Sequence, residues 1–448
     1  MSIQPLLVRS ATLCDGQRTD IFIDNGRIAE QGTVASRPGA TTIDADGLLV
    51  LPGLVDLHAH LREPGFEHSE TVLTGTRAAA AGGFTAVFAM ANTSPVADTA
   101  SVVEQVLALG ERAGYATVRP IGAVSVGLAG EKLSEIGTMA SSRARVRVFS
   151  DDGKCVWDPL LMRRALEYVK AFDGVIAQHA QEPRLTVDAQ MNEGAVSSEL
   201  GLTGWPTVAE ESIIERDVSL AQAAGSRLHI CHVSSAGSVD IIRWAKKRGI
   251  AVTAEVTPHH LLLTEDLASD YNSRFKVNPP LRTLDDVEAL RGALADGTID
   301  IVATDHAPHP VEAKECEWTA AAFGMVGLES ALSVVHSAVV ANGLLDWTDV
   351  ARVMSSEPAR IGQLAGYDDP FAVGARANMA LYDPAAEHVF DIGSLVGTSA
   401  NSPYLGRKLP GRVRATIHNG YLTVRNGELI GADEVACAAR LPKEDASA

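Results

Sequence analysis

Residues 48–60 read LLVLPGLVDLHAH, an apolar run that ends in two histidines separated by one residue. Short runs rich in Leu, Val and Ile are typical of strands that are buried on both faces, as in parallel sheets. In an extended segment, residues i and i+2 point to the same side, so His58 and His60 can hold one metal ion. The stretch therefore predicts a buried strand with a metal site at its carboxyl end.

Seven further runs of this kind follow along the chain. They are AVFAM (86–90), RPIGAVSV (119–126), VRVFS (146–150), VIAQ (175–178), LHIC (228–231), AVTAEVT (251–257) and IDIVAT (299–304). Segments with helical i, i+3, i+4 apolar spacing separate them, such as 158–172 and 211–225, the second of which ends at Gly225. This alternation predicts an α/β fold, a (β/α)8 TIM-like barrel.

The residues just past the strands of such a barrel converge on one mouth. Four more residues of metal-ligand type stand at the ends of these runs, namely Asp152, His179, His232 and Asp305. Asp305 directly follows a strongly apolar run, where an unpaired carboxylate would be costly to bury. A metal or a proton-transfer role removes this difficulty, so the six residues together indicate a metal-dependent hydrolase.

The two ends of the chain show a different pattern. Dipeptides that favour tight β turns occur in both, at Asp15-Gly16, Asn25-Gly26, Asn419-Gly420 and Asn426-Gly427. We therefore expect antiparallel β structure at each end, combined into one small β-sandwich domain of residues 1–52 and 371–448. The barrel, residues 53–370, would be inserted between them.

The net charge and the cysteines of the chain limit the kinds of partner and the cellular compartment that we expect. The formal net charge of −18 argues against nucleic acid and anionic membranes, which require concentrated Lys and Arg. The five cysteines are widely spaced without a CxxC pair, which suits a reducing cytoplasm. We find no secretion signal and no apolar run long enough to span a membrane.

Eight motifs occur in a characteristic order. They are LPGLVDLHAHLREPG, MANTSP, FSDDG, AQHAQEP, HICHVSS, EVTPHHLLL, KVNPPLR and ATDHAPH. With them, residues 45 to 330 resemble the amidohydrolase superfamily, and most closely its bacterial class I dihydroorotases. The resemblance implies a zinc enzyme that reversibly cyclises N-carbamoyl-L-aspartate to (S)-dihydroorotate in de novo pyrimidine (UMP) biosynthesis.

The resemblance also implies how the metal site is divided. His58, His60 and Asp305 would hold one zinc, and His179 and His232 a second. Many relatives bridge the two metals with a carboxylated lysine after the fourth strand, but here that strand ends in Ser150-Asp151-Asp152-Gly153. Class I dihydroorotases use an aspartate, for which the spacing favours Asp152, while Asp151 stays open as the alternative. One or two zinc ions per chain are compatible with this pattern.

Roles in catalysis and substrate binding follow from the same resemblance. Asp305 would move the proton between the attacking water and the ring nitrogen. Arg62 lies two residues beyond His60, and its guanidinium suits the carboxylate of dihydroorotate. The implied substrate contacts are His60, Arg62, Asn92, Asn278, His309, Phe323 and Gly324. Lys276 and Arg282 flank Asn278 and are interpreted as solvated loop charges.

Two alternatives remain at this point. One is a hydantoinase, dihydropyrimidinase or allantoinase, whose ring substrates lack a comparable carboxylate. The other is a non-catalytic amidohydrolase-like scaffold, such as a partner subunit of aspartate transcarbamoylase. We also expect a homo-oligomer, and the resemblance extends to class I members that associate with aspartate transcarbamoylase.

Overall fold

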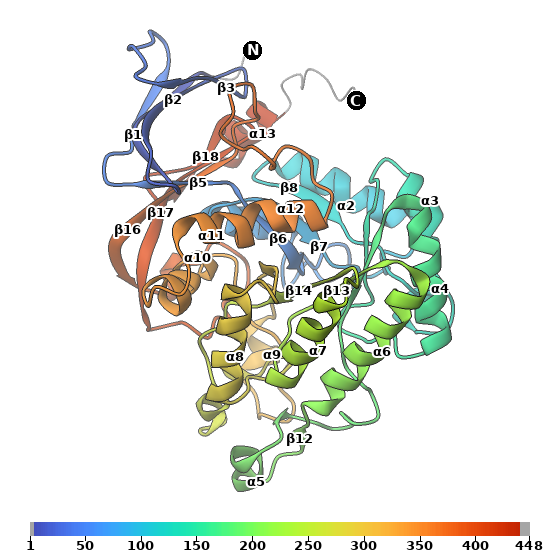
Figure 1. Cartoon of the computed structure of the whole chain (residues 1–448). Helices are drawn as coiled ribbons and strands as arrows, with labels where there is room; N and C mark the ends of the chain where they lie inside the picture. The colour runs from blue at the N-terminus through green and yellow to red at the C-terminus, as the bar shows by residue number, and fades with distance from the viewer. Residues whose placement is uncertain (1–3, 440–448) are drawn as a thin grey trace.

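The computed structural model describes residues 4–439, and one nine-stranded sheet in it combines both ends of the chain. From the amino-terminal end come β1 (Leu6–Leu13), β2 (Arg18–Asp24), β3 (Arg27–Gly32), β4 (Thr41–Asp44) and β5 (Leu49–Pro52). From the other end come β16 (Met379–Val389), β17 (Lys408–His418), β18 (Tyr421–Arg425) and β19 (Glu428–Leu429). Figure 1 shows these blue and red-orange strands together at the upper left.

The order of strands in this sheet is β19-β18-β17-β16-β5-β1-β2-β3, with β4 also paired to β1. The two ends meet where β5 pairs antiparallel with β16, which places Leu51 opposite Ala380. The expected β element built from both ends is therefore present. Most pairs in this sheet are antiparallel, as expected, but β4 and β5 run parallel to β1, which was not expected. The boundaries at residues 52 and 371 stay a prediction.

The eight predicted apolar runs all contain parallel strands. A three-stranded sheet holds β6 (Leu54–Ala59), β7 (Phe84–Ala89) and β8 (Thr117–Pro120). A five-stranded sheet holds β9 (Val148–Phe149), β10 (Val175–Gln178), β13 (Arg227–Ile230), β14 (Val252–Val256) and β15 (Ile301–Val302). Isolated parallel bridges link Gly122 to Phe149 and Ala59 to His306, so each sheet approaches the other at both edges.

The first run divides into two strands at Gly53, which sequence reasoning did not foresee. β5 belongs to the terminal sheet and β6 to the parallel strands. A Cβ atom at Gly53 would lie 2.2 Å from Thr85 Oγ1, so only glycine fits where the chain passes from one sheet to the other. β6, which contains His58 and leads to His60, therefore begins directly beside the terminal sheet.

Helices surround the parallel strands (Figure 1). They are α1 (Val72–Ala81), α2 (Ala100–Ala113), α3 (Ile136–Ser141), α4 (Pro159–Val169), α6 (Val208–Ala224), α7 (Ala236–Lys247), α8 (Leu284–Ala295), α10 (Ala331–Val335), α11 (Trp347–Ala351) and α12 (Glu357–Ile361). The predicted helices at 158–172 and 211–225 are confirmed as α4 and α6. Gly225 ends α6 with a φ of +61°.

Smaller elements complete the chain. A two-stranded parallel pair holds β11 (Met191–Asn192) and β12 (Gly204–Trp205), near the short helix α5 (Ala195–Leu200). The short helix α9 (Val311–Lys314) follows β15, and α13 (Ala432–Ala439) follows β19. No described helix is both long enough and apolar enough to cross a bilayer.

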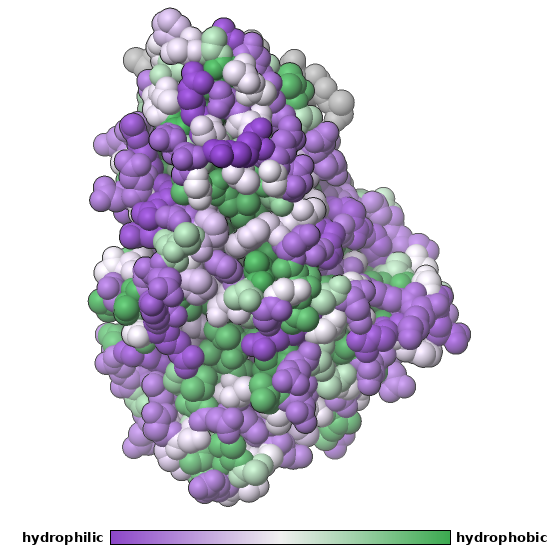
Figure 2. Space-filling view, turned by 60° about the vertical axis from the view of Figure 1, so that its left-hand side comes forward, coloured by the Kyte–Doolittle hydropathy of each residue, from purple (hydrophilic) through white to green (hydrophobic). Residues whose placement is uncertain are grey.

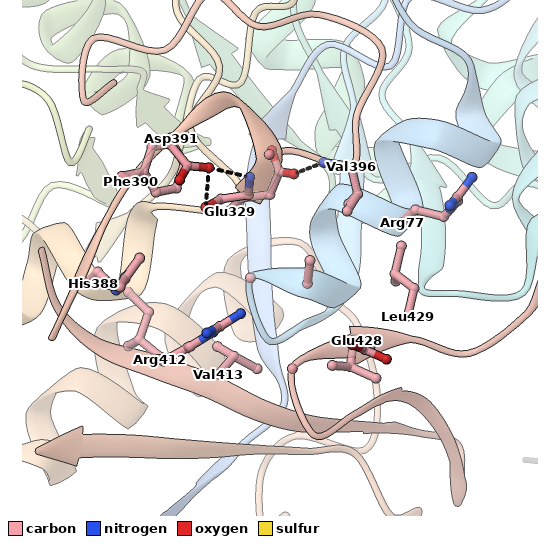
Figure 3. Close-up of a pocket in the computed structure, with 18 of the residues that line it drawn as sticks. Arg77, Glu329, His388, Phe390, Asp391, Val396, Arg412, Val413, Glu428 and Leu429 are labelled. Carbon is pink, nitrogen blue, oxygen red and sulfur yellow. Dashed lines mark hydrogen bonds between the residues drawn. The ribbon is translucent and has the colours of Figure 1, made fainter. Parts of the chain in front are cut away.

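Apolar side chains fill two layers around the parallel strands. An inner cluster that includes Val55, Phe88, Val148 and Ile301 lies between the strands, and a larger cluster packs the strands against the helices. The face in Figure 2 is mainly polar, with smaller apolar areas between the charged groups. A cavity of about 680 Å³, lined by Arg77, Glu329 and His388 among others, lies where the terminal sheet meets α1 and α10 (Figure 3).

Candidate metal centre

Six buried side chains converge at the carboxyl ends of the parallel strands. His58 belongs to β6, and His60 follows it, while the other four come after β9, β10, β13 and β15. The six are His58, His60, Asp152, His179, His232 and Asp305, all at most 5% exposed. The structure thus brings together every predicted metal ligand, although they lie up to 247 positions apart in the sequence.

The first group surrounds one oxygen of Asp152. His58 Nε2 and His60 Nε2 each lie 3.3 Å from Asp152 Oδ2. The same two nitrogens lie 3.4 Å and 3.1 Å from Asp305 Oδ1. Two imidazole nitrogens and two carboxylate oxygens are therefore close enough to share one metal ion.

The second group surrounds the other oxygen of Asp152. His179 Nδ1 and His232 Nε2 both lie 3.2 Å from Asp152 Oδ1, and 2.9 Å from each other. One carboxylate thus faces a separate histidine pair with each of its oxygens. This arrangement suits a carboxylate that bridges two metal ions.

The donor atoms fit a metal better than a purely hydrogen-bonded cluster. His58 Nε2 is buried without a hydrogen-bond partner in the described part of the chain, which is costly unless a cation binds there. Imidazole nitrogens with carboxylate oxygens are the ligands of zinc and related transition metals. Burial alone would raise the pKa of the Asp152 carboxyl, but His58 and the other imidazoles hold it well below its usual range.

Two of the six residues have a strained backbone conformation. His232 has a φ of +32° and Asp305 a φ of +47°, values that residues other than glycine rarely adopt. Both residues directly or nearly follow a strand and turn their side chains toward the cluster. Strain of this kind typically occurs at functional sites, where the surrounding structure enforces it.

Asp151, the open alternative to Asp152, faces away from the histidines. Its Oδ1 accepts hydrogen bonds from the backbone N–H groups of Val124 (2.8 Å) and Ser125 (2.9 Å), and its Oδ2 accepts one from the Ser125 hydroxyl. Asp151 therefore fixes the loop after β8. Asp152 is the member of the pair that lies among the imidazoles.

Glu255 is a residue of the centre that sequence reasoning missed. Its Oε1 lies 2.6 Å from His58 Nδ1, and its Oε2 lies 3.0 Å from Nε2 of His229. Burial alone would raise the pKa of the Glu255 carboxyl, but His58 and His229 hold it far below its usual value. A carboxylate on the far nitrogen of a ligating histidine fixes its tautomer and orientation. The available signal was one acidic residue inside the apolar run AVTAEVT.

Two amides orient other histidines in the same way. Asn92 Oδ1 lies 2.9 Å from His60 Nδ1, and Gln181 Oε1 lies 2.7 Å from His179 Nε2. Gln181 Oε1 also accepts a hydrogen bond of 3.2 Å from Asn278 Nδ2. Of the predicted substrate residues, Asn92 therefore contacts a metal-type histidine directly, and Asn278 is linked to one through Gln181. The Oδ1 atom of Asn278 is buried and has no partner among the described residues.

The remaining predicted substrate residues form one group beside the centre. Arg62 Nε donates to the carbonyl of Pro308 (3.1 Å), and its Nη2 lies 3.4 Å from His309 Nε2. His309 Nε2 lies 2.8 Å from the carbonyl oxygen of Phe323. Burial, with the nearby charge of Arg62, lowers the pKa of His309 to about 3, so its ring is neutral. Burial lowers the pKa of Arg62 to about 10, which leaves it cationic at neutral pH.

Lys276 and Arg282 are not solvated loop charges, so that interpretation was wrong. Both are only 1% exposed. Arg282 donates to Asn192 Oδ1 (2.7 Å) and to the carbonyl of Trp205 (2.6 Å), and Lys276 donates to the carbonyl of Trp318 (2.6 Å). The two acceptors of Arg282 lie 77 and 90 positions away in the sequence, so the local sequence does not reveal these contacts.

Comparisons with known proteins agree with this geometry. A dihydro-orotase-like family model matches residues 47–238. The dihydroorotase of Leifsonia xyli subsp. xyli is 73% identical over 430 residues, which cover 96% of this chain and 98% of the relative. The dihydroorotases of Streptomyces coelicolor and Mycobacterium tuberculosis are 64% and 53% identical, over 94% and 93% of this chain and 99% and 97% of their own.

Solved structures support the same fold. An L-hydantoinase from Arthrobacter aurescens aligns with a TM-score of 0.85 at 24% identity, covering 96% of this chain and 98% of its own. A dihydropyrimidinase from Brevibacillus agri aligns with a TM-score of 0.80 at 22% identity, covering 97% of each chain. These likenesses concern the fold, whereas the identities to curated relatives extend over nearly the whole length. The chain belongs to the dihydroorotase family of the amidohydrolase superfamily, as its motifs predicted.

Proposed function

We propose that the chain is a zinc-dependent dihydroorotase that reversibly cyclises N-carbamoyl-L-aspartate to (S)-dihydroorotate in de novo pyrimidine biosynthesis. The observation that carries this proposal is the Asp152 carboxylate placed between two pairs of imidazoles, with Arg62 beside them. Identity of 73% to a curated dihydroorotase supports it. The proposal includes a closed (β/α)8 barrel, which the two isolated parallel bridges favour, and a β-sandwich domain of residues 1–52 and 371–448.

In this proposal His58, His60 and Asp305 would hold one zinc ion and His179 and His232 a second, and Asp152 would be a ligand shared by the two groups. Zinc, when bound, polarises a carbonyl and lowers the pKa of water from 15.7 to about 7. The protein holds its own ligands ready for this, because Glu255 and Asn92 fix the rings of His58 and His60. The site excludes most water, since all six ligands are buried.

Asp305 moves the proton. Burial alone would raise its pKa, but the neighbouring His58 and His60 hold it at about 2, so the carboxylate is ionised and able to accept a proton. In ring opening Asp305 takes a proton from the attacking water and delivers it to the departing ring nitrogen. In ring closure the same carboxylate takes the proton from the carbamoyl nitrogen and returns it to the departing water.

Arg62, with Asn92 and His309, holds the ring carboxylate of dihydroorotate. Arg62 is a half-buried cation with a fork geometry that suits two parallel hydrogen bonds to a carboxylate. Asn278 and the backbone of Phe323 and Gly324 contact the amide edges of the ring. The unpartnered Oδ1 of Asn278 is available as an acceptor for a ring N–H.

The main alternative is a hydantoinase or dihydropyrimidinase, because solved enzymes of these names share the fold. Arg62 favours dihydroorotate, since hydantoin, dihydrouracil and allantoin have no comparable carboxylate. The purified protein should be offered all four substrates, with and without a chelator and after addition of zinc or other divalent metals. We expect preferred turnover of dihydroorotate that chelation abolishes and zinc restores. Preference for hydantoin would reject the proposal.

Arg62→Met separates substrate recognition from metal binding. Loss of two charge-assisted hydrogen bonds should lower kcat/KM for dihydroorotate by about a hundredfold or more. Metal content and any slow turnover of dihydrouracil should stay unchanged. Full activity of this variant on dihydroorotate would show that the carboxylate binds elsewhere.

Assembly belongs to the same proposal. A homo-oligomer, and association with aspartate transcarbamoylase, can be tested by light scattering of the cytoplasmic enzyme alone and with the transcarbamoylase.

A further inference from the structure

Two buried lysines hold the segment that carries Phe323 and Gly324. Lys314, on α9, is 2% exposed. Its Nζ donates to the carbonyl oxygens of Ala322 (2.8 Å), Gly324 (3.0 Å) and Lys276 (3.1 Å). An ammonium group has three N–H donors, and all three are therefore used on backbone carbonyls.

Lys276 reaches the same segment from the opposite side. Its Nζ donates to the carbonyl oxygens of Trp318 (2.6 Å) and Thr319 (3.4 Å), and to Gln190 Oε1 (2.8 Å). The Lys276 ammonium also lies 4.5 Å from the centroid of the Phe323 ring, a cation–π contact. The Gly324 N–H donates to the Lys276 carbonyl at 3.0 Å. The two lysines and the segment are thus cross-linked by hydrogen bonds in both directions.

This segment in turn sets the position of His309. The Phe323 carbonyl accepts the hydrogen bond from His309 Nε2, and the same nitrogen lies 3.4 Å from Arg62 Nη2. Gly324 packs so closely that a Cβ atom there would lie 2.9 Å from His309 Nε2. Asn401 adds support, because its Nδ2 donates to the Gly324 carbonyl and its Oδ1 accepts from the His309 N–H. A shift of the segment would therefore move His309 against Arg62.

The two ammonium groups are unusual because neither pairs with a carboxylate among the described residues. The charged or ionisable groups that face them are each other, Cys316 and, for Lys314, His309. Burial lowers the pKa of Lys314 to about 7 and that of Lys276 to about 8, so keeping each side chain charged lowers the free energy of unfolding. An apolar side chain would avoid this cost, which indicates that the bonds to the segment matter.

We propose that Lys314 and Lys276 are positioning residues for the carboxylate-binding part of the site: they fix Phe323 and Gly324, which orient His309 beside Arg62. This inference rests on the proposed function, because it assigns the substrate carboxylate to Arg62 and His309. Neither lysine touches the substrate in this arrangement. Their effect is transmitted through backbone carbonyls.

The test uses Lys314→Gln and Lys276→Gln in the full chain, with Lys246→Gln as the matched control. Lys246 Nζ also binds a backbone carbonyl, that of Gly297 at 3.0 Å, but it pairs with Asp300 and lies on α7. We expect KM for dihydroorotate to rise about tenfold or more in the two test variants, with a smaller change in kcat. Amide hydrogen exchange should accelerate in residues 311–327. Metal content should not change, and the control should show neither effect.

A double-mutant cycle separates positioning from general loosening. If the lysines act through His309 and Arg62, the effect of Lys314→Gln on KM should largely disappear in an Arg62→Met background. Additive effects would refute the proposal. So would an unchanged KM in a variant whose 311–327 segment exchanges faster, while the proposed function would stand.

If the native chain does not turn over dihydroorotate, the proposed function fails. If amide hydrogen exchange in residues 311–327 is also unaltered in both lysine variants, the two lysines do not hold this segment, and the further inference fails as well. If Lys314→Gln does not fold, Gly324→Ala perturbs the next contact, that between the segment and His309, because the added Cβ would crowd His309 Nε2. It should raise KM in the same selective way, and an unchanged KM would contradict the inference.

Discussion

The adjacent carboxylates Asp151 and Asp152 allow a sharp test of the metal centre. Both are buried, and they differ in what they touch. Asp152 lies 3.2 to 3.3 Å from four histidine nitrogens, two on each oxygen. In Asp152→Asn one of these oxygens becomes an NH₂ group, which cannot bind a cation. Both metal sites are adjacent to the altered side chain, so both should be weakened.

The size of the effect follows from the contacts. Removal of a partner one step behind a metal ligand lowers metal affinity by about 10- to 100-fold, and loss of a bridging ligand should exceed this. Asp151→Asn keeps Oδ1 for the N–H groups of Val124 and Ser125, and its new NH₂ group can donate to the Ser125 hydroxyl. It loses only the charge of these bonds, about 1 to 3 kcal/mol of stability.

The assay is metal content by elemental analysis after dialysis against zinc and then zinc-free buffer, with thermal unfolding measured in parallel. We expect Asp152→Asn to lose metal and activity while it stays folded. Asp151→Asn should keep both metal and activity and unfold at a lower temperature. The opposite pattern, with metal lost from Asp151→Asn and retained in Asp152→Asn, would refute the assignment of the bridge.

Two other predictions concern groups away from the bridge. Glu255→Gln should weaken metal binding by about 10- to 100-fold, because His58 loses its anionic partner; a zinc titration in competition with a chelator measures this, and unchanged affinity would contradict it. Burial raises the pKa of Glu329 to about 7. The folded chain therefore holds this proton more strongly than the unfolded chain. As the pH rises from 4.5 to 7, the contribution of Glu329 to the free energy of unfolding falls. Urea unfolding of Glu329→Gln should lack this slope, and an identical slope would exclude Glu329 as its source.

Sequence reasoning found the strands and the metal-type residues because both signals are local. Five of the eight apolar runs are followed closely by one of the six residues of metal-ligand type, and parallel strands bring such ends together. The choice between Asp151 and Asp152 needed the structure, since adjacent residues in one loop differ only in direction. The Asp151 contacts come from residues after β8, which no local pattern reveals.

The features that sequence reasoning missed or placed wrongly all depend on contacts between segments that are far apart in the sequence. In the sequence Lys276 and Arg282 look like exposed charges of a loop, but each donates hydrogen bonds to carbonyl oxygens of distant segments. Glu255 looks like part of an ordinary strand in the sequence, because its partner His58 lies 197 positions away. The division of the first run at Gly53 depends on the close approach of Thr85, another contact that the sequence does not contain.

The pairing of β5 with β16 has a consequence for synthesis on the ribosome. A nascent chain that has emerged as far as residue 370 already contains all six metal-type residues, but it lacks β16 to β19. Until β16 emerges, β5 has an unpaired edge, and β5 leads through Gly53 directly into β6, which contains His58 and is followed by His60. We therefore expect the centre to acquire its metal after translation has passed the late strands, rather than while the chain is growing.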